Sequence, residues 1–142
     1  MTKIELTLAE ILSLHVELYG TQKQNGEAVE GILSGKMALT TRYWLNDLGK
    51  KVAAEKESVD KLRNELITKH GEQKDESVVI ETFIGEGEER TVNPKFIEFQ
   101  NEYGALLDEK REMEYKKLTL DDINKIESDV HCPVFFKLID AE

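Results

Sequence analysis

The chain has 142 residues, of which 39% are hydrophobic and 34% charged, and 29 acidic against 19 basic side chains give a formal net charge of −10 at pH 7. This length predicts one domain over residues 1–142 with a real core. The negative charge disfavours nucleic acid and anionic membranes as partners. No apolar stretch approaches the roughly 20 residues that cross a bilayer. The N-terminus also lacks an apolar secretion signal, so a cytoplasmic protein is expected.

The first predicted helix covers residues 8–19. Thr7 and Glu10 have the spacing of a capping box, in which each side chain binds the backbone amide of the other residue. Apolar side chains follow at helical spacing, and Gly20 stands where a left-handed C-terminal cap is typical. Residues 21–26 are polar and loop-like. Residues 27–33 are expected to form a short helical turn.

A long helix is predicted over residues 36–70, because no proline interrupts it and two columns of side chains repeat every seven positions. Those columns are Thr41, Leu48, Glu55, Leu62 and Leu45, Val52, Val59, Leu66. The helix would span about 50 Å, more than a chain of this size needs for its own diameter. A second copy is therefore expected to cover part of the seam. Gly49 indicates a kink or a close helix approach, and Gly71 should end the helix.

A short hairpin is predicted next, with a strand in residues 77–84, an acidic glycine-rich turn and a return strand at residues 90–92. Asn93 and Pro94 then start a second long helix, as a capping side chain followed by proline at the first helical position. We expect this helix to pack antiparallel to the first long helix. Its seam side chains, three and four residues apart, are Phe96, Phe99, Tyr103, Leu106, Lys110 and Met113.

The words at residues 6–11 and 118–123 share the pattern Leu-Thr-Leu-x-acid-Ile, and each predicts a short strand followed by a threonine-capped helix. Residues 3–6 and 115–118 are expected to join the hairpin at 78–92 in one small sheet. The fold class is therefore mainly α (α+β), a long antiparallel helical hairpin with a small β-sheet and short terminal helices.

Pro133 can start a last helical turn. It carries an apolar patch that we interpret as core, with an interface as the alternative: Val134, Phe135, Leu138 and Ile139.

The sequence predicts no enzyme, catalytic residue, metal site or cofactor. The glycines lack the Lys-Ser/Thr pair of a phosphate-binding loop. His15, His70 and His131 form no pair at helical spacing that could bind a metal. Cys132 follows His131, but adjacent side chains usually point apart, so we interpret this thiol as a small hydrophobe rather than a nucleophile.

One segment departs from the acidic average, because residues 31–56 hold five basic against two acidic side chains and carry a local charge of +3. The same segment contains the only tryptophan. Cations beside aromatic rings can bind a nucleotide or anchor a protein contact. The alternative is a core tryptophan with lysines on the outer face of a helix. The candidate ligand-binding residues are Lys36, Arg42, Tyr43, Trp44 and Lys50.

Several sequence words occur in a characteristic order. The capped first helix is followed by ELITKHGE at 65–72, NPKF at 93–96, EYGALLDE at 102–109 and EYKKLTLDDI at 114–123. Together these words resemble small acidic accessory proteins of tailed phages that infect Gram-positive bacteria. The resemblance brings no catalytic residue and implies a non-enzymatic phage product. One such role is a counter-defence homo-oligomer, assembled through the long helix, that sequesters a host nucleotide-type immune signal. The other is a structural or assembly component of the particle that contacts host or virion proteins.

Overall fold

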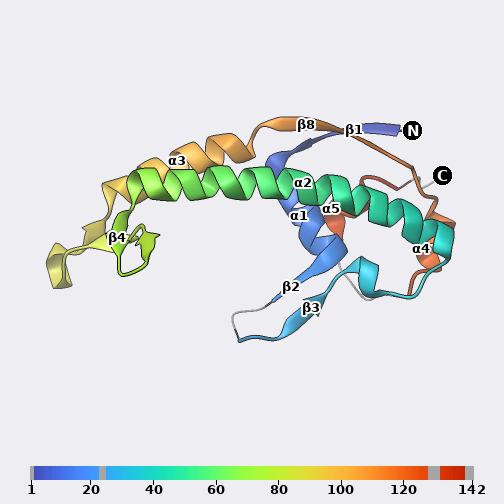
Figure 1. The fold of residues 1–142 in the computed structure, drawn as a ribbon, viewed down its shortest axis with the longest axis horizontal. Coiled ribbons are helices and arrows are strands. Elements are labelled where there is room, and N and C mark those ends of the chain that lie inside the picture. The colour runs from blue at the N-terminus through green and yellow to red at the C-terminus, as the bar shows by residue number, and fades with distance from the viewer. Residues whose placement is uncertain (1, 23–24, 128–131, 140–142) are drawn as a thin grey trace. The chain divides into compact units, whose positions relative to one another are not determined.

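A computed structural model describes residues 2–22, 25–127 and 132–139 and has the expected mixed α+β fold (Figure 1). The chain forms two compact units, unit 1 from residues 1–56 and 110–142, and unit 2 from residues 57–109. The single domain expected from the length stays a prediction. In chain order the elements are β1 (Thr2–Thr7), α1 (Leu8–Tyr19), β2 (Gly20–Gln22), β3 (Ala28–Glu30), the 3-10 helix η1 (Ile32–Ser34), α2 (Leu39–His70), β4 (Glu72–Lys74), β5 (Ser77–Val79), β6 (Phe83–Ile84), the 3-10 helix η2 (Gly87–Glu89), β7 (Thr91–Val92), α3 (Pro94–Leu107), β8 (Lys110–Tyr115), α4 (Leu120–Asn124) and α5 (Pro133–Phe136).

The capping box that starts α1 is present, which confirms the prediction from Thr7 and Glu10. The Thr7 hydroxyl oxygen accepts from the Glu10 amide at 3.2 Å, and the Glu10 carboxylate accepts from the Thr7 amide at 3.2 Å. Thr119 and Asp122 repeat this arrangement at the start of α4. Because capping depends on residues three apart, it is predictable from local sequence.

The core of unit 1 lies between α1, the first part of α2 and the C-terminal segment. Side chains from all three are at most 8% exposed: Ile11, Leu14, Leu18, Leu45, Leu48, Val52, Phe135, Leu138 and Ile139. Phe135, Leu138 and Ile139 therefore belong to the core, as predicted, and Val134 is partly buried against it. A Cβ at Gly49 would lie 2.5 Å from the Tyr19 hydroxyl oxygen, which confirms a close approach at this glycine.

Strand β8 corrects the prediction that the second long helix continues through Lys110 and Met113. Helix α3 ends at Leu107, and residues 110–115 pair antiparallel with β1 in a register that runs from Thr2 opposite Tyr115 to Thr7 opposite Lys110. Met113 and Tyr115 are buried while Glu112 and Glu114 are exposed, which is the alternation of a strand with one buried face. Pairing with β1 outweighed the helical spacing.

Residues 27–33 do not form the predicted helical turn. Strand β3 pairs with β2, and only residues 32–34 are helical, as the 3-10 helix η1. Gly20 allows this reversal, because it has a φ of 83° and a Cβ there would lie 2.1 Å from the Val29 carbonyl oxygen. The glycine thus ends α1 as predicted, and it also begins a hairpin that was not predicted from the sequence.

The single small sheet predicted for residues 3–6, 115–118 and 78–92 is wrong. The strands in the described part of the chain form four separate two-stranded sheets, β1–β8, β2–β3, β4–β5 and β6–β7. Strand β5 pairs with its immediate neighbour β4, and Asp75 between them adopts a positive φ of 52°. Asp tolerates this backbone better than most residues, so the chain reverses locally. The predicted return strand survives as β7, which pairs with β6.

In unit 2, α3 is antiparallel to the last part of α2. The Arg63 guanidinium lies 6.0 Å from the centre of the Tyr103 ring, and further along α2 His70 contacts Glu98. Rising residue numbers on α2 therefore meet falling numbers on α3, which confirms the helical hairpin. Asn93 caps α3 by accepting from the Lys95 amide at 3.1 Å, with Pro94 in the first turn as predicted. In the ranges that the structure describes, no helix is both long and apolar enough to span a membrane.

Candidate functional site

The first part of α2 presents two opposite faces. Its core face carries Leu45, Leu48 and Val52, which are at most 4% exposed. Positions separated alternately by four and three residues lie on the same side of a helix. The opposite side therefore holds a continuous row of exposed residues: Leu39, Tyr43, Asn46 and Lys50.

Leu39 and Tyr43 are the unusual members of this outward row. The Leu39 side chain is 85% exposed and Tyr43 is 64% exposed. Single exposed apolar residues are common on protein surfaces, but these two are neighbours on one helical ridge. Leu39 was not among the residues predicted from the sequence. Leu39 precedes Tyr43 by four residues, so the two side chains lie on the same side of the helix. This spacing identifies Leu39 once the direction of the core face is known.

Arg42 lies beside this row and binds backbone. Its Nη1 donates to the Leu33 carbonyl at 2.8 Å, and its Nη2 donates to the Gly35 carbonyl at 2.6 Å. These two bonds hold the end of η1 against the first turn of α2. The structure therefore gives this predicted ligand-binding residue a clear structural task, with one N–H of each terminal nitrogen already used.

Trp44 is half-buried and packs against the unit 1 core, which is the alternative that the sequence left open. The cavity that it lines with Leu45, Tyr115 and Phe135 has a volume of about 10 Å³. That volume corresponds to about one water molecule. The rings of Tyr43 and Trp44 pack edge to face, with 4.9 Å between their centres and 85° between their planes. Trp44 thus supports the exposed Tyr43 ring.

Lys36 and Lys50 are both exposed. The Lys36 carbonyl accepts from the Glu127 amide at 2.9 Å, so the backbone before α2 is held by a bridge that leaves the side chain out of the contact. Of the five predicted residues, three reach the outer surface and two are engaged by the fold. We use the name basic face for Lys36, Leu39, Tyr43 and Lys50.

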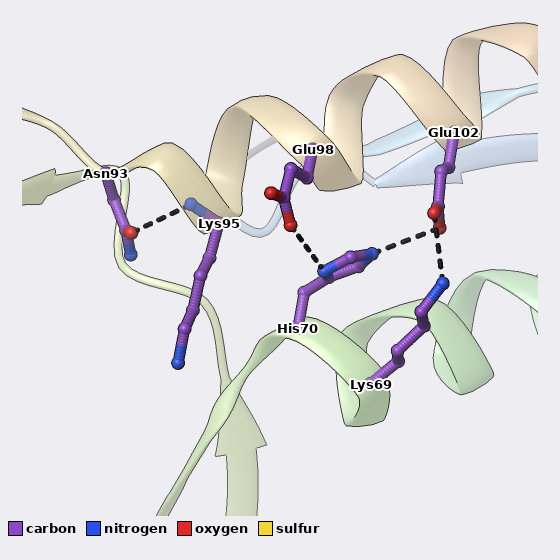
Figure 2. A network of polar contacts seen from close by, with 6 residues as sticks. All are labelled: Lys69, His70, Asn93, Lys95, Glu98 and Glu102. Carbon is purple, nitrogen blue, oxygen red and sulfur yellow. Dashed lines mark hydrogen bonds and ion pairs between the residues drawn. The ribbon is translucent and has the colours of Figure 1, made fainter.

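A polar cluster, separate from the basic face, joins the end of α2 to α3 inside unit 2 (Figure 2). His70 is 8% exposed, with Nε2 3.0 Å from a Glu102 carboxylate oxygen and Nδ1 3.4 Å from a Glu98 carboxylate oxygen. Lys69 lies 3.0 Å from the other Glu102 oxygen. The hydrogen bond from His70, followed by that from Lys69, lowers the pKa of Glu102. This cluster fixes two helices to one another, and within the described residues no group of three potential ligands could hold a metal ion.

Cys132 is buried. Burial raises the pKa of its thiol, and the nearby charge of Glu17 raises it further. Both effects favour the protonated thiol over the thiolate that a nucleophile requires, in keeping with the structural role expected from the sequence. His131, the adjacent residue in the chain, lies outside the described residues.

Comparison with protein-family models, with curated proteins and with solved structures found no match to this chain.

Proposed function

We propose that this chain is a non-enzymatic, phage-encoded binding protein that docks a partner protein on the basic face of α2 and acts in the cytoplasm of the host cell. One observation carries the proposal. Leu39 and Tyr43, 85% and 64% exposed, form an apolar ridge directly opposite the core seam of the same helix.

The residue types on this face match the anatomy of a protein contact. Covering a leucine or a large aromatic side chain contributes roughly 1.5–3 kcal/mol, and tyrosine is among the residues that most often anchor an interface. Lys36 and Lys50 flank the apolar pair and are exposed. Charges at the rim mainly steer a partner and select its sign. The expected partner therefore offers an apolar socket with acidic surroundings.

The shape of the face favours a protein over a small ligand. Pockets for small molecules are concave and usually enclose about 300–1,000 Å³, whereas Leu39, Tyr43 and Lys50 lie along the outer side of one helix. The cavity beneath Trp44 is only about 10 Å³. Arg42, the natural partner for a phosphate, already donates to two backbone carbonyls.

Site-specific photo-crosslinking tests the proposal. A photo-reactive phenylalanine derivative in place of Tyr43 should yield a protein adduct in phage-infected cells. The same group in place of Lys117, an exposed residue of unit 1 outside the basic face, should yield much less. Leu39→Asp should suppress the adduct at position 43. Equal yields at both positions, or none at position 43, would contradict the proposal. A virion protein in the adduct would indicate an assembly role, and a host defence protein would indicate counter-defence.

Sequestration of a nucleotide-type immune signal is a second candidate, favoured by the local charge of +3 in residues 31–56. On this hypothesis a second copy would supply the missing walls of the pocket. Cyclic nucleotides or ADP-ribose derivatives should then raise the melting temperature, and Lys36→Glu with Lys50→Glu should abolish the rise. A rise that survives both substitutions, or no rise with any compound, rejects this candidate.

A further inference from the structure

The charge of this chain is distributed unevenly between its two units. Unit 2 holds 14 acidic against 6 basic side chains, a net charge of −8, whereas residues 31–56 of unit 1 carry +3. Opposite potentials on two surfaces steer them towards each other and disfavour contacts between like surfaces. Each copy therefore carries both the basic face and a strongly acidic unit that could meet the basic face of another copy.

Within unit 2, the hairpin β6–β7 combines acidic and apolar side chains. Phe83, Ile84 and Val92 are 43–45% exposed, and Phe83 pairs directly with Val92. The turn between the strands carries three exposed glutamates, Glu86, Glu88 and Glu89. We call residues 83–92 the acidic hairpin. The three glutamates outweigh Arg90, whose guanidinium lies 4.2 Å from the centre of the Phe83 ring. The acidic hairpin is thus the counterpart of the basic face, with apolar side chains on both and opposite net charges.

The acidic hairpin is held in a defined shape. Gly85 and Gly87 have positive φ values of 85° and 60°. A Cβ at Gly85 would lie 2.6 Å from the Glu89 carbonyl oxygen, so this turn requires glycine. The base of the hairpin is tied to the start of α3, because the Asn93 amide donates to the Thr82 carbonyl at 2.9 Å and its side chain donates to the Glu81 carbonyl at 2.8 Å. A preformed surface loses less entropy on binding.

We infer that the partner docked on the basic face is a second copy of this chain, which presents its acidic hairpin. Leu39 and Tyr43 would cover Phe83, Ile84 and Val92, while the two lysines meet the glutamates of the turn. This inference rests on the proposed function and names the partner. Because the two surfaces differ, the contact is head-to-tail and each copy can bind one neighbour at each surface. The assembly then grows with concentration unless it closes into a ring.

Two variants that each remove one surface test this inference. Variant one, Tyr43→Asp with Lys50→Glu, lacks a functional basic face. Variant two, Glu86→Lys with Glu89→Lys, lacks a functional acidic hairpin. All four positions are exposed, so both variants should fold, and circular dichroism and thermal melting check this. Lys117→Glu is the control, with a charge change of the same sign on unit 1 outside the basic face.

Sedimentation velocity provides the readout. Wild type and Lys117→Glu should form oligomers whose mass rises with concentration and falls near 1 M salt, where the screening length is only ~3 Å. Each variant alone should associate at least roughly tenfold more weakly, because like charges then oppose each other. An equimolar mixture should form a discrete heterodimer of twice the monomer mass, since one intact surface of each kind remains.

The contrary results are distinct. A mixture that stays monomeric, or one variant that still dimerises alone, overturns the head-to-tail contact. A wild type that is monomeric at every concentration overturns self-association. In that case the proposed function still stands if the photo-reactive group at position 43 crosslinks to a protein other than this chain. Failure to crosslink to any protein removes both.

Discussion

The two halves of α2 share one heptad pattern but differ in burial. Before residue 57 the seam is covered, with Leu45, Leu48 and Val52 at most 4% exposed. After it, Leu62 is 43% exposed, and Val59 and His70 are the only buried side chains among residues 57–109, all of which the structure describes. The same apolar period therefore specifies a helix in both units, but it makes a dense core only where other elements supply the second layer.

The two units are therefore stabilised mainly by different kinds of contact. Unit 1 is held mainly by apolar packing, in which a buried leucine contributes a few kcal/mol. Unit 2 relies more on polar contacts between α2 and α3, on helix capping and on short hairpins. Partly exposed polar contacts are individually worth less, because water and salt screen them. We expect substitutions in the two units to differ in size and in their dependence on pH.

The largest contrast should come from truncating two leucines of the heptad seam, one in each unit. Leu45→Ala leaves a cavity in a core position that is 1% exposed and should cost about 2–5 kcal/mol of unfolding free energy. Leu62→Ala, at a position that is 43% exposed, should cost about 1 kcal/mol or less. Urea denaturation followed by circular dichroism measures both. Similar losses at the two positions would show that the heptad seam is equally covered along its length.

A smaller effect is expected at the polar cluster of unit 2. His70→Ala removes the contacts with Glu98 and Glu102 and should cost about 1–2 kcal/mol. Loosening should be local, with faster hydrogen exchange in α3 amides and little change in α1. Lys61→Ala, an exposed position on the same helix that no described polar contact involves, serves as the control. Uniform loosening of both units would contradict this division.

The smallest effect concerns acid. The pKa of Glu102 lies below its ordinary value of 4.5, mainly because of the hydrogen bond from His70 and then that from Lys69. The fold thus favours the ionised Glu102 carboxylate over the protonated acid. The stability that this carboxylate contributes is present above pH 4.5 and is lost as pH falls through the lowered pKa. Glu102→Gln should weaken this acid dependence in unit 2. Hydrogen exchange of α3 between pH 3 and pH 6 checks this prediction, and an unchanged dependence would exclude Glu102 as its source.

Local signals predicted much of the secondary structure. Helix α1, its capping box, the end of α2 at His70 and the Asn93-Pro94 start of α3 depend on residues within one helical turn of each other. Such local interactions form whatever the position of the segment in the tertiary structure. The opposite-face row of α2 was also implicit in the heptad pattern, although Leu39 was overlooked.

The sequence by itself therefore determined where α1 begins and ends, where α2 ends and where α3 begins. It also determined that residues 31–56 would be basic and aromatic in an acidic chain. Only the tertiary structure decided that residues 110–115 pair with β1, because the strand pairing joins segments more than a hundred residues apart. It also assigned Arg42 to backbone carbonyls and Trp44 to the core, and it left Tyr43 and Lys50 outside. A side chain's type shows which contacts it can make, but the neighbours that folding brings to it determine which contacts it makes.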